Sequence, residues 1–147
     1  MKIPSQKVIL CGEFGVGKSS LFRRFMSDSF TTATDRKSTM GLDHYSKVYS
    51  AQERELKLQL WDTGGMERVA SITSSYYKHS EAAILVFALD NPDTFHILSQ
   101  HLLDIVTYAE NAKIFLYVFR AFYSCFDKHQ TFIKGAGTNL TRRIRFK

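Results

Sequence analysis

The sequence predicts an α/β fold, in which a mostly parallel sheet is covered by helices. Short apolar segments alternate with segments of helical spacing in the order β-α-β-β-α-β-α-β, which is typical of sheets built from strand–helix–strand units. Residues 82–88 are almost continuously apolar, as expected for a central strand covered on both faces. The length of 147 residues fits one domain with its own core. Ligands in such sheets bind at the carboxyl ends of the strands.

The individual elements are read from local patterns. The predicted strands cover residues 7–11, 43–50, 56–61, 82–88 and a segment beginning at Lys113, and the predicted helices cover residues 17–26, 68–79 and a segment beginning at Asn91. Residues 56–61 alternate between apolar and polar side chains, the period of a strand. Asn91 and Pro92 are typical of a helix cap and a first helical position. That helix is expected to bury one apolar face formed by Phe95, Leu98, Leu102 and Ile105.

A glycine-rich loop follows the first predicted strand. Residues 12–19 read G-x-x-x-x-G-K-S and lead directly into a helix. Such a loop aims backbone N–H groups and the positive end of the helix dipole at one point. Gly15 and Gly17 let the backbone approach a phosphate chain closely. Lys18 is expected to reach the β- and γ-phosphates, and the Ser19 hydroxyl to hold Mg²⁺. An ordinary glycine-rich surface loop is the alternative.

An acidic residue ends a neighbouring predicted strand. Asp62 follows residues 56–61 and precedes Thr63, Gly64 and Gly65. A carboxylate at that position can bind Mg²⁺ directly or through water. The two glycines give the following segment freedom to move, with the Gly65 amide placed to sense a γ-phosphate. A simple strand-ending aspartate is the alternative.

Together these motifs resemble those of the Ras-superfamily small GTPases, and of the Rab-like branch in particular. The resemblance covers residues 5–116. Residues 38–43 resemble the first switch region, and residues 61–68, W-D-T-G-G-M-E-R, resemble the second, which usually reads W-D-T-A-G-Q-E-R. It implies a P-loop nucleotide hydrolase fold, which is a doubly wound, mostly parallel sheet with helices on both faces, here incomplete at its C-terminal end.

The resemblance also implies a ligand set, GTP or GDP with Mg²⁺. It assigns Mg²⁺ to Ser19, Thr39 and Asp62, with Thr39 also sensing the γ-phosphate. Phe30 lies at the spacing of the aromatic residue that stacks on guanine. The implied nucleotide-binding residues are Glu13, Phe14, Gly15, Val16, Gly17, Lys18, Ser19, Ser20, Phe30, Thr39, Asp62 and Gly65. Without the resemblance, Phe30 reads as a loop anchor and Thr39 as a solvated turn residue.

Two departures from the family pattern bear on hydrolysis. Met66 stands where the family has the glutamine that orients the attacking water, and a thioether cannot replace an amide because it donates no N–H. Phe14 is bulky at a position where small residues make room for the water and an arginine finger. No residue is therefore assigned a catalytic role with Met66 in place, and slow hydrolysis is expected.

A third departure concerns guanine recognition. The family has N-K-x-D after the strand that here begins at Lys113, followed by an S-A-K-like loop. The sequence instead continues through residues 116–123 as L-Y-V-F-R-A-F-Y. The final strand and helix of the fold are also hard to find. Their loss is expected to expose one edge and one face of the sheet.

The last 31 residues differ in composition from the rest. Residues 117–147 hold seven of the 20 Lys and Arg residues but one of the 14 Asp and Glu residues, so residues 1–116 carry no net charge. Seven aromatic residues lie in the same segment: Tyr117, Phe119, Phe122, Tyr123, Phe126, Phe132 and Phe146. We therefore predict a Rab-like domain over residues 5–116 and a basic aromatic tail over residues 117–147. The tail is interpreted as unrelated sequence, as in an alternative-exon or shifted-frame product; surfaces for single-stranded nucleic acid or anionic lipid are the alternatives.

Several sequence features bear on location. No apolar run approaches the ~20 residues that a membrane span needs, and the N-terminus leaves no room for a secretory signal. Cys11 and Cys125 do not form a disulfide framework. The C-terminus has no cysteine for prenylation. A cytoplasmic location is expected, with peripheral association with intracellular membranes as an alternative.

Three functions remain in competition. The first is a Rab-like GTP-binding switch in vesicle trafficking or signalling, which binds effectors and regulators through its two switch regions. The second is a truncated, non-enzymatic interaction module with weak or no guanine-nucleotide binding. The third, a nucleic-acid binder, rests on the tail alone, and no nucleic-acid partner is expected.

Overall fold

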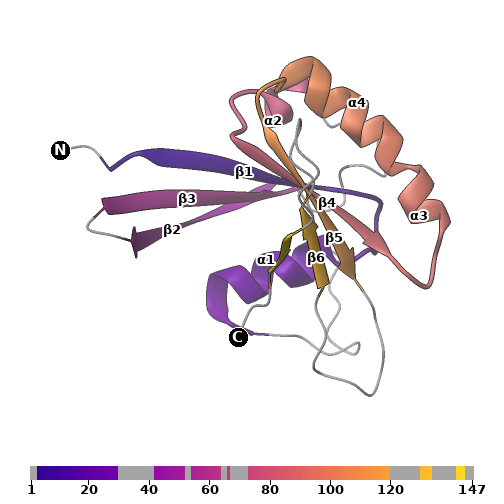
Figure 1. The fold of residues 1–147 in the computed structure, drawn as a ribbon, viewed down its shortest axis with the longest axis horizontal. Helices are drawn as coiled ribbons and strands as arrows, with labels where there is room; N and C mark the ends of the chain where they lie inside the picture. Colours follow the sequence, from indigo (N-terminus) through magenta and orange to yellow (C-terminus); the bar gives the residue numbers. More distant parts are fainter. Residues whose placement is uncertain are drawn as a thin grey trace.

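The fold is a single sheet with helices packed on both faces (Figure 1). The computed structural model describes residues 3–29, 42–51, 54–63, 66, 73–119, 130–133 and 142–144. The strands are β1 (Ser5–Cys11), β2 (Asp43–Ala51), β3 (Arg54–Asp62), β4 (Ala82–Ala88), β5 (Lys113–Phe119), β6 (Gln130–Ile133) and β7 (Arg142–Ile144). The helices are α1 (Lys18–Ser27), α2 (Ser74–Tyr77), α3 (Asp93–His96) and α4 (Leu98–Tyr108).

The strand order is β2-β3-β1-β4-β5-β6-β7. The four strands β3, β1, β4 and β5 are parallel. Antiparallel pairs lie at the two ends of the sheet, with β2 beside β3 at one end and β6 and β7 beyond β5 at the other. The predicted α/β class and its parallel centre are therefore confirmed.

Two apolar clusters fill the spaces between the sheet and its helices. Because successive strand residues point to opposite faces, Val8 and Leu10 pack on one side of β1, while Ile9 and Cys11 pack on the other. The first side is covered by α1 through Phe22. The second is covered by α2 and α4, and α3 lies on the same side (Figure 1). This arrangement confirms helices on both faces.

The helical segment after Pro92 differs from the prediction. It forms two helices, α3 and α4, separated by a turn at Ile97. Phe95 and Leu102, both expected in the core, are 49% and 40% exposed. The break at Ile97 and the burial of Leu98, His101 and Ile105 define a different inner face for α4. The core prediction is confirmed for Leu98 and Ile105 and wrong for the other two.

The helix predicted over residues 68–79 is shorter at its C-terminal end. Residues 67–72 lie outside the described residues, and α2 ends at Tyr77. His79 has a φ of 61°, a left-handed conformation that cannot continue a right-handed helix. The expectation of helix as far as His79 is therefore wrong.

The C-terminal side of the sheet also differs from expectation. β5 continues to Phe119, and β6 pairs with it from Phe115 to Val118 in antiparallel register. The edge of β5 is thus paired with β6, so the expectation that β5 would form an exposed edge is wrong. On the α1 side of the sheet, α1 is the one helix within the described ranges. The boundary between residues 116 and 117 stays a prediction.

Candidate functional site

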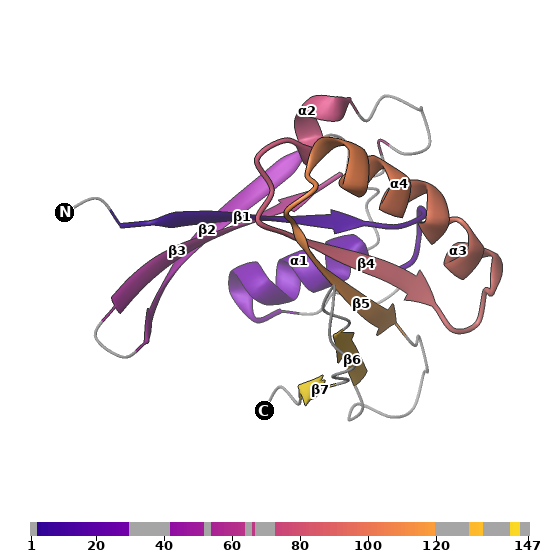
Figure 2. The same ribbon diagram turned by 45° about the horizontal axis from the view of Figure 1, so that its top comes forward.

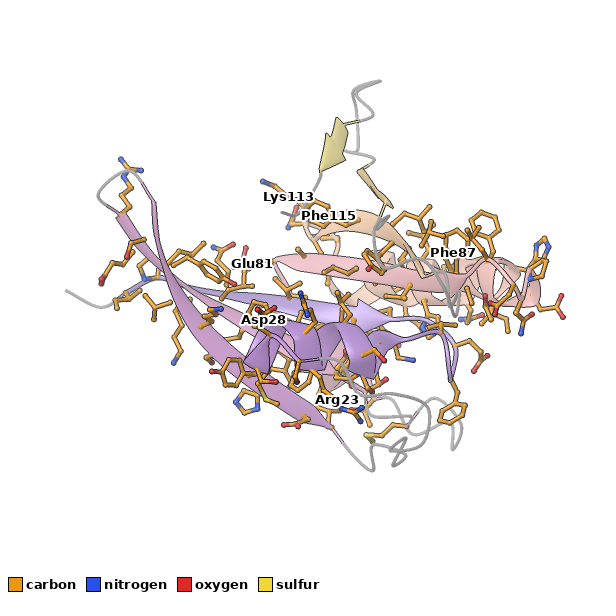
Figure 3. The ribbon with its side chains drawn as sticks, turned by 90° about the horizontal axis from the view of Figure 1, so that it is seen from below. Arg23, Asp28, Glu81, Phe87, Lys113 and Phe115 are labelled. Atoms are coloured by element: carbon orange, nitrogen blue, oxygen red, sulfur yellow. The ribbon has the colours of Figure 1, made fainter. Side chains whose placement is uncertain are left out.

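The candidate site lies where the carboxyl ends of β1, β3 and β4 meet. These parallel strands end at the same side of the sheet, and the loop after β1 leads into α1 there (Figure 2). Figure 3 shows the direction of β4, with Glu81 before its start and Phe87 near its far end. β5 begins at Lys113, whose backbone N–H donates to the Glu81 carbonyl over 3.0 Å. The site residues therefore follow strands at the centre of the sheet, at the end opposite to this bond.

The glycine loop depends on backbone conformations that other residues rarely adopt. Gly12, Gly15 and Gly17 have φ values of 145°, 83° and 101°. A Cβ on Gly12 would lie 2.1 Å from the Val86 carbonyl oxygen, so β4 passes too close for any side chain. A Cβ on Gly15 would meet nothing within 4 Å. The loop is thus packed against β4 on one side and open on the other.

Lys18 is folded back over this loop. Its side chain is 4% exposed, and Nζ donates to the carbonyl oxygens of Gly12 and Glu13 over 2.9 Å and 2.8 Å. A buried cation needs such oxygen partners to offset its lost hydration. The lysine charge is therefore fixed at the loop, at the first turn of α1, where anions are stabilised.

The remaining loop residues divide between packing and exposure. Val16 is 1% exposed and belongs to the core cluster with Phe22, so its side chain attaches the loop to the hydrophobic core. Phe14 is 44% exposed, and its N–H donates to Glu13 Oε1 over 2.8 Å. Ser20 lies in the first turn of α1. Any ligand contact of Val16 would therefore involve its backbone.

Ser19 at the start of α1 lies beside Asp62 at the end of β3. Ser19 Oγ donates to Asp62 Oδ2 over 2.6 Å, joining the first turn of α1 to the end of β3. Asp62 is fully buried, and its other oxygen, Oδ1, has no hydrogen-bond partner within the described ranges. A buried carboxylate with one unpartnered oxygen is costly unless a cation offsets it.

These residues fit the Mg²⁺ and phosphate groups that the sequence implies. Carboxylate and hydroxyl oxygens are suitable ligands for Mg²⁺ or for its bound waters, and the Ser19 hydroxyl lies 2.6 Å from Oδ2 of the Asp62 carboxylate. The open side of the loop at Gly15 offers space for an anion beside the Lys18 charge. The side chains at this site therefore include donors that suit both groups.

Some predicted site residues are not placed by the structure. Phe30, Thr39 and Gly65 lie outside the described residues. Met66 is half-buried, and its N–H donates to the Thr63 carbonyl oxygen over 3.1 Å. The roles assigned to these residues stay predictions.

Sequence reasoning missed two residues beside the site. Tyr76 Oη lies 2.8 Å from the carbonyl oxygen of Leu10, which is two positions before Gly12, and Lys7 Nζ donates to the Tyr76 carbonyl oxygen on α2. Neither residue belongs to a recognised motif. The only available signal was a Tyr-Tyr pair in a segment of weak periodicity, which gives no indication of a partner on β1.

A glycine loop between a strand and a helix, with a buried aspartate at the end of the adjacent strand, defines the class of P-loop nucleotide-binding proteins. The Ras family model matches residues 7–121. The chain belongs to the Ras family, and the relatives it matches are Rab-like.

Three relatives illustrate the match. The chain is 41% identical over 111 residues to Ras-related protein Rab-12 of Mus musculus, covering 75% of this chain and 45% of the relative. It is 40% identical over 103 residues to GTP-binding protein ypt1 of Schizosaccharomyces pombe, covering 70% and 50%. It is 36% identical over 112 residues to Ras-related protein RABA2a of Arabidopsis thaliana, covering 76% and 51%. The chain thus spans about half the length of these relatives.

No helix in the described part of the chain has the length and hydrophobicity that a transmembrane segment needs.

Proposed function

We propose that this chain is a Rab-like GTP-binding protein that acts as a Mg²⁺-dependent nucleotide switch with slow hydrolysis. The observation that carries the proposal is the contact between Ser19 and Asp62, in which a buried carboxylate keeps one oxygen without a hydrogen-bond partner among the residues that the structure describes. The relative ypt1 is a GTP-binding protein, which supports the same ligand.

Each site residue then has a defined task. Ser19 and Asp62 hold Mg²⁺ with Thr39, and the backbone of residues 13–20 surrounds the phosphates, with Lys18 supplying positive charge. Phe30 stacks on the base, and the Gly65 amide senses the γ-phosphate. Bound Mg²⁺ would neutralise charge on the phosphates.

Hydrolysis is expected to be slow for two physical reasons. Met66 offers no N–H donor and only a weak acceptor, so it cannot orient an attacking water as an amide does. Phe14 is 44% exposed on the loop and occupies space beside the site. Both residues favour a protein that remains longer in the triphosphate-bound state.

A non-enzymatic interaction module is the second candidate function. The sequence of residues 116–123 favours this function, because it lacks the N-K-x-D motif that recognises guanine in the family. Such a protein would keep the switch surfaces for effectors and regulators but bind guanine nucleotide weakly.

We further propose vesicle trafficking as the process served, in line with the Rab-like relatives. The proposed partners are effector and regulator proteins that bind the two switch regions. The proposed location is cytoplasmic, with peripheral association with intracellular membranes.

One experiment separates the two candidates. The full chain is purified in Mg²⁺, the bound nucleotide is released by denaturation, and the nucleotide is identified by chromatography. About one equivalent of GDP or GTP supports the switch, and a nucleotide-free protein that also fails to bind added GDP overturns it. Titration with ADP and ATP tests selectivity, since equal binding of adenine and guanine nucleotides would contradict the guanine assignment.

A further inference from the structure

The hydroxyl of Tyr76 lies at the point where β1 and β3 separate. The two strands pair in parallel register as far as Ile9 and Trp61, and no pair follows between them. Beyond that pair, β1 leads into the glycine loop and β3 reaches Asp62. Backbone carbonyls at such a divergence lose their partners in the sheet and need another donor if they are buried.

Tyr76 supplies that donor from α2. Its hydroxyl lies 2.8 Å from the Leu10 carbonyl oxygen and 3.0 Å from the Trp61 carbonyl oxygen, so one proton is shared between the two strands. The side chain is 3% exposed. Burial raises the pKa of the Tyr76 phenol well above its ordinary value, so the hydroxyl keeps its proton and remains a donor at neutral pH.

The Lys7 side chain holds the backbone of Tyr76. Its Nζ donates to the backbone carbonyl oxygens of Tyr76 and Lys78, over 2.5 Å and 2.9 Å. The same ammonium lies 4.9 Å from the Trp61 ring centroid and 5.8 Å from that of Tyr76, within the range of cation–π attraction. Tyr76 is therefore held at its backbone by β1 while its hydroxyl holds β1 and β3.

We propose that Tyr76 is a positioning residue that sets the spacing between the end of β1 and the end of β3, and through it the meeting of Ser19 with Asp62. The Leu10 carbonyl precedes the glycine loop by one residue, Cys11, and the Trp61 carbonyl belongs to the peptide bond of Asp62. A displacement of the Leu10 carbonyl would therefore move the glycine loop, and a displacement of the Trp61 carbonyl would move Asp62, because one or two peptide units connect them. The importance of this spacing for ligand binding rests on the proposed function.

The neighbouring tyrosine provides a matched control. Tyr77 is also 3% exposed, but its hydroxyl donates to Asp104 Oδ2 on α4 over 3.3 Å, away from the strand ends. Both Tyr76→Phe and Tyr77→Phe remove one hydroxyl from a buried ring of α2. A merely structural role for the Tyr76 hydroxyl would make the two variants behave alike.

The first measurement uses the full chain without ligand. We expect amide hydrogen exchange at residues 10–12 and 61–63 to accelerate by about tenfold in Tyr76→Phe and to stay unchanged in Tyr77→Phe. The fluorescence of Trp61, the single tryptophan, should shift in the first variant only. Equal exchange at both segments in the two variants would overturn the proposal.

The second measurement is GDP affinity with and without Mg²⁺. Losing one buried hydrogen bond corresponds to about a tenfold change in an equilibrium constant. The GDP affinity of Tyr76→Phe should therefore fall by about that factor when Mg²⁺ is present, and should not change when Mg²⁺ is absent. Unchanged affinity in Tyr76→Phe also overturns the proposal, while the proposed function stands. If the wild-type chain binds no nucleotide, the proposed nucleotide-binding function is overturned. Amide hydrogen exchange at residues 10–12 and 61–63 then decides whether Tyr76 positions the two strand ends.

A second variant covers the case in which Tyr76→Phe does not fold. Lys7→Met keeps an unbranched side chain but removes the donor to the Tyr76 backbone. It should accelerate exchange at residues 10–12 and 61–63 in the same pattern. Exchange identical to wild type at both segments would contradict the positioning of Tyr76.

Discussion

Ser19 Oγ donates a 2.6 Å hydrogen bond to Asp62 Oδ2, across 43 positions of sequence. The contact joins the first turn of α1 to the end of β3. Because Asp62 is fully buried and its Oδ1 has no partner within the described ranges, the carboxylate is stabilised incompletely by the protein alone. Incomplete stabilisation is expected of a group whose remaining partner is a bound cation.

Asp62→Asn is expected to separate ligand binding from stability. It should lower GDP affinity in Mg²⁺ by roughly tenfold to a hundredfold, because interactions of a charged group contribute about 1.5–3 kcal/mol. The ligand-free stability should stay equal or rise, since a buried and partly unpartnered charge is removed. Calorimetric titration and urea unfolding measure the two effects. Asp104→Asn on α4 is the control, and a similar loss of affinity there would contradict the assignment.

Gly12→Ala and Gly15→Ala are expected to differ strongly in stability. Alanine at position 12 places its Cβ 2.1 Å from the Val86 carbonyl oxygen, whereas alanine at position 15 meets nothing within 4 Å. Both substitutions carry backbone strain of about 1–2 kcal/mol because φ is positive. Gly12→Ala should cost a further ~1–3 kcal/mol or more through overpacking. Urea unfolding checks this difference, and equal midpoints for the two variants would argue against the close approach of β4.

The sequence was sufficient to predict the centre of the fold and the edge of the sheet at which Ser19 and Asp62 lie. Parallel strands with apolar residues on both sides leave few arrangements, and their carboxyl ends must meet at one edge. Ser19 and Asp62 could therefore be proposed as ligands of one Mg²⁺ from their motifs and the family resemblance, whereas the hydrogen bond between them was not predicted. Such patterns depend on local periodicity, which the packed sheet preserves.

Features that depend on relative orientation could not be predicted. Phe95 and Leu102 fit a helical apolar stripe, but the turn at Ile97 changes which face of α4 is buried. The Tyr76 hydroxyl meets carbonyl groups 66 and 15 positions away in the sequence, and backbone acceptors leave no trace in side-chain patterns. The strands β6 and β7 are short and lie in a segment where charge and aromatic content obscure any period-2 pattern.

Met66→Gln is expected to accelerate single-turnover GTP hydrolysis by about tenfold or more, because an amide can orient the attacking water. The prediction depends on nucleotide binding, so each protein is first loaded with GTP and its occupancy is measured. Met26→Gln on α1, where the side chain is 39% exposed, is the matched control and should leave the rate unchanged. A wild-type rate equal to that of Met66→Gln would show that Met66 does not limit hydrolysis.

Alkaline pH is expected to destabilise the protein through its buried tyrosines. Burial raises the pKa of Tyr117 above the ordinary value of 10.0, and it raises that of Tyr76 well above the same value. Above pH 10 the unfolded chain loses these protons while the folded chain keeps them, so unfolding releases protons and the free energy of unfolding falls as pH rises. The stability that depends on the neutral phenols is fully present below pH 10. It is lost as the pH rises through the raised pKa values of the folded state.

Urea unfolding between about pH 9 and about pH 11 tests this expectation. The free energy of unfolding should decline less steeply with pH for Tyr117→Phe than for wild type. A Tyr117→Phe curve parallel to that of wild type would contradict the role of burial.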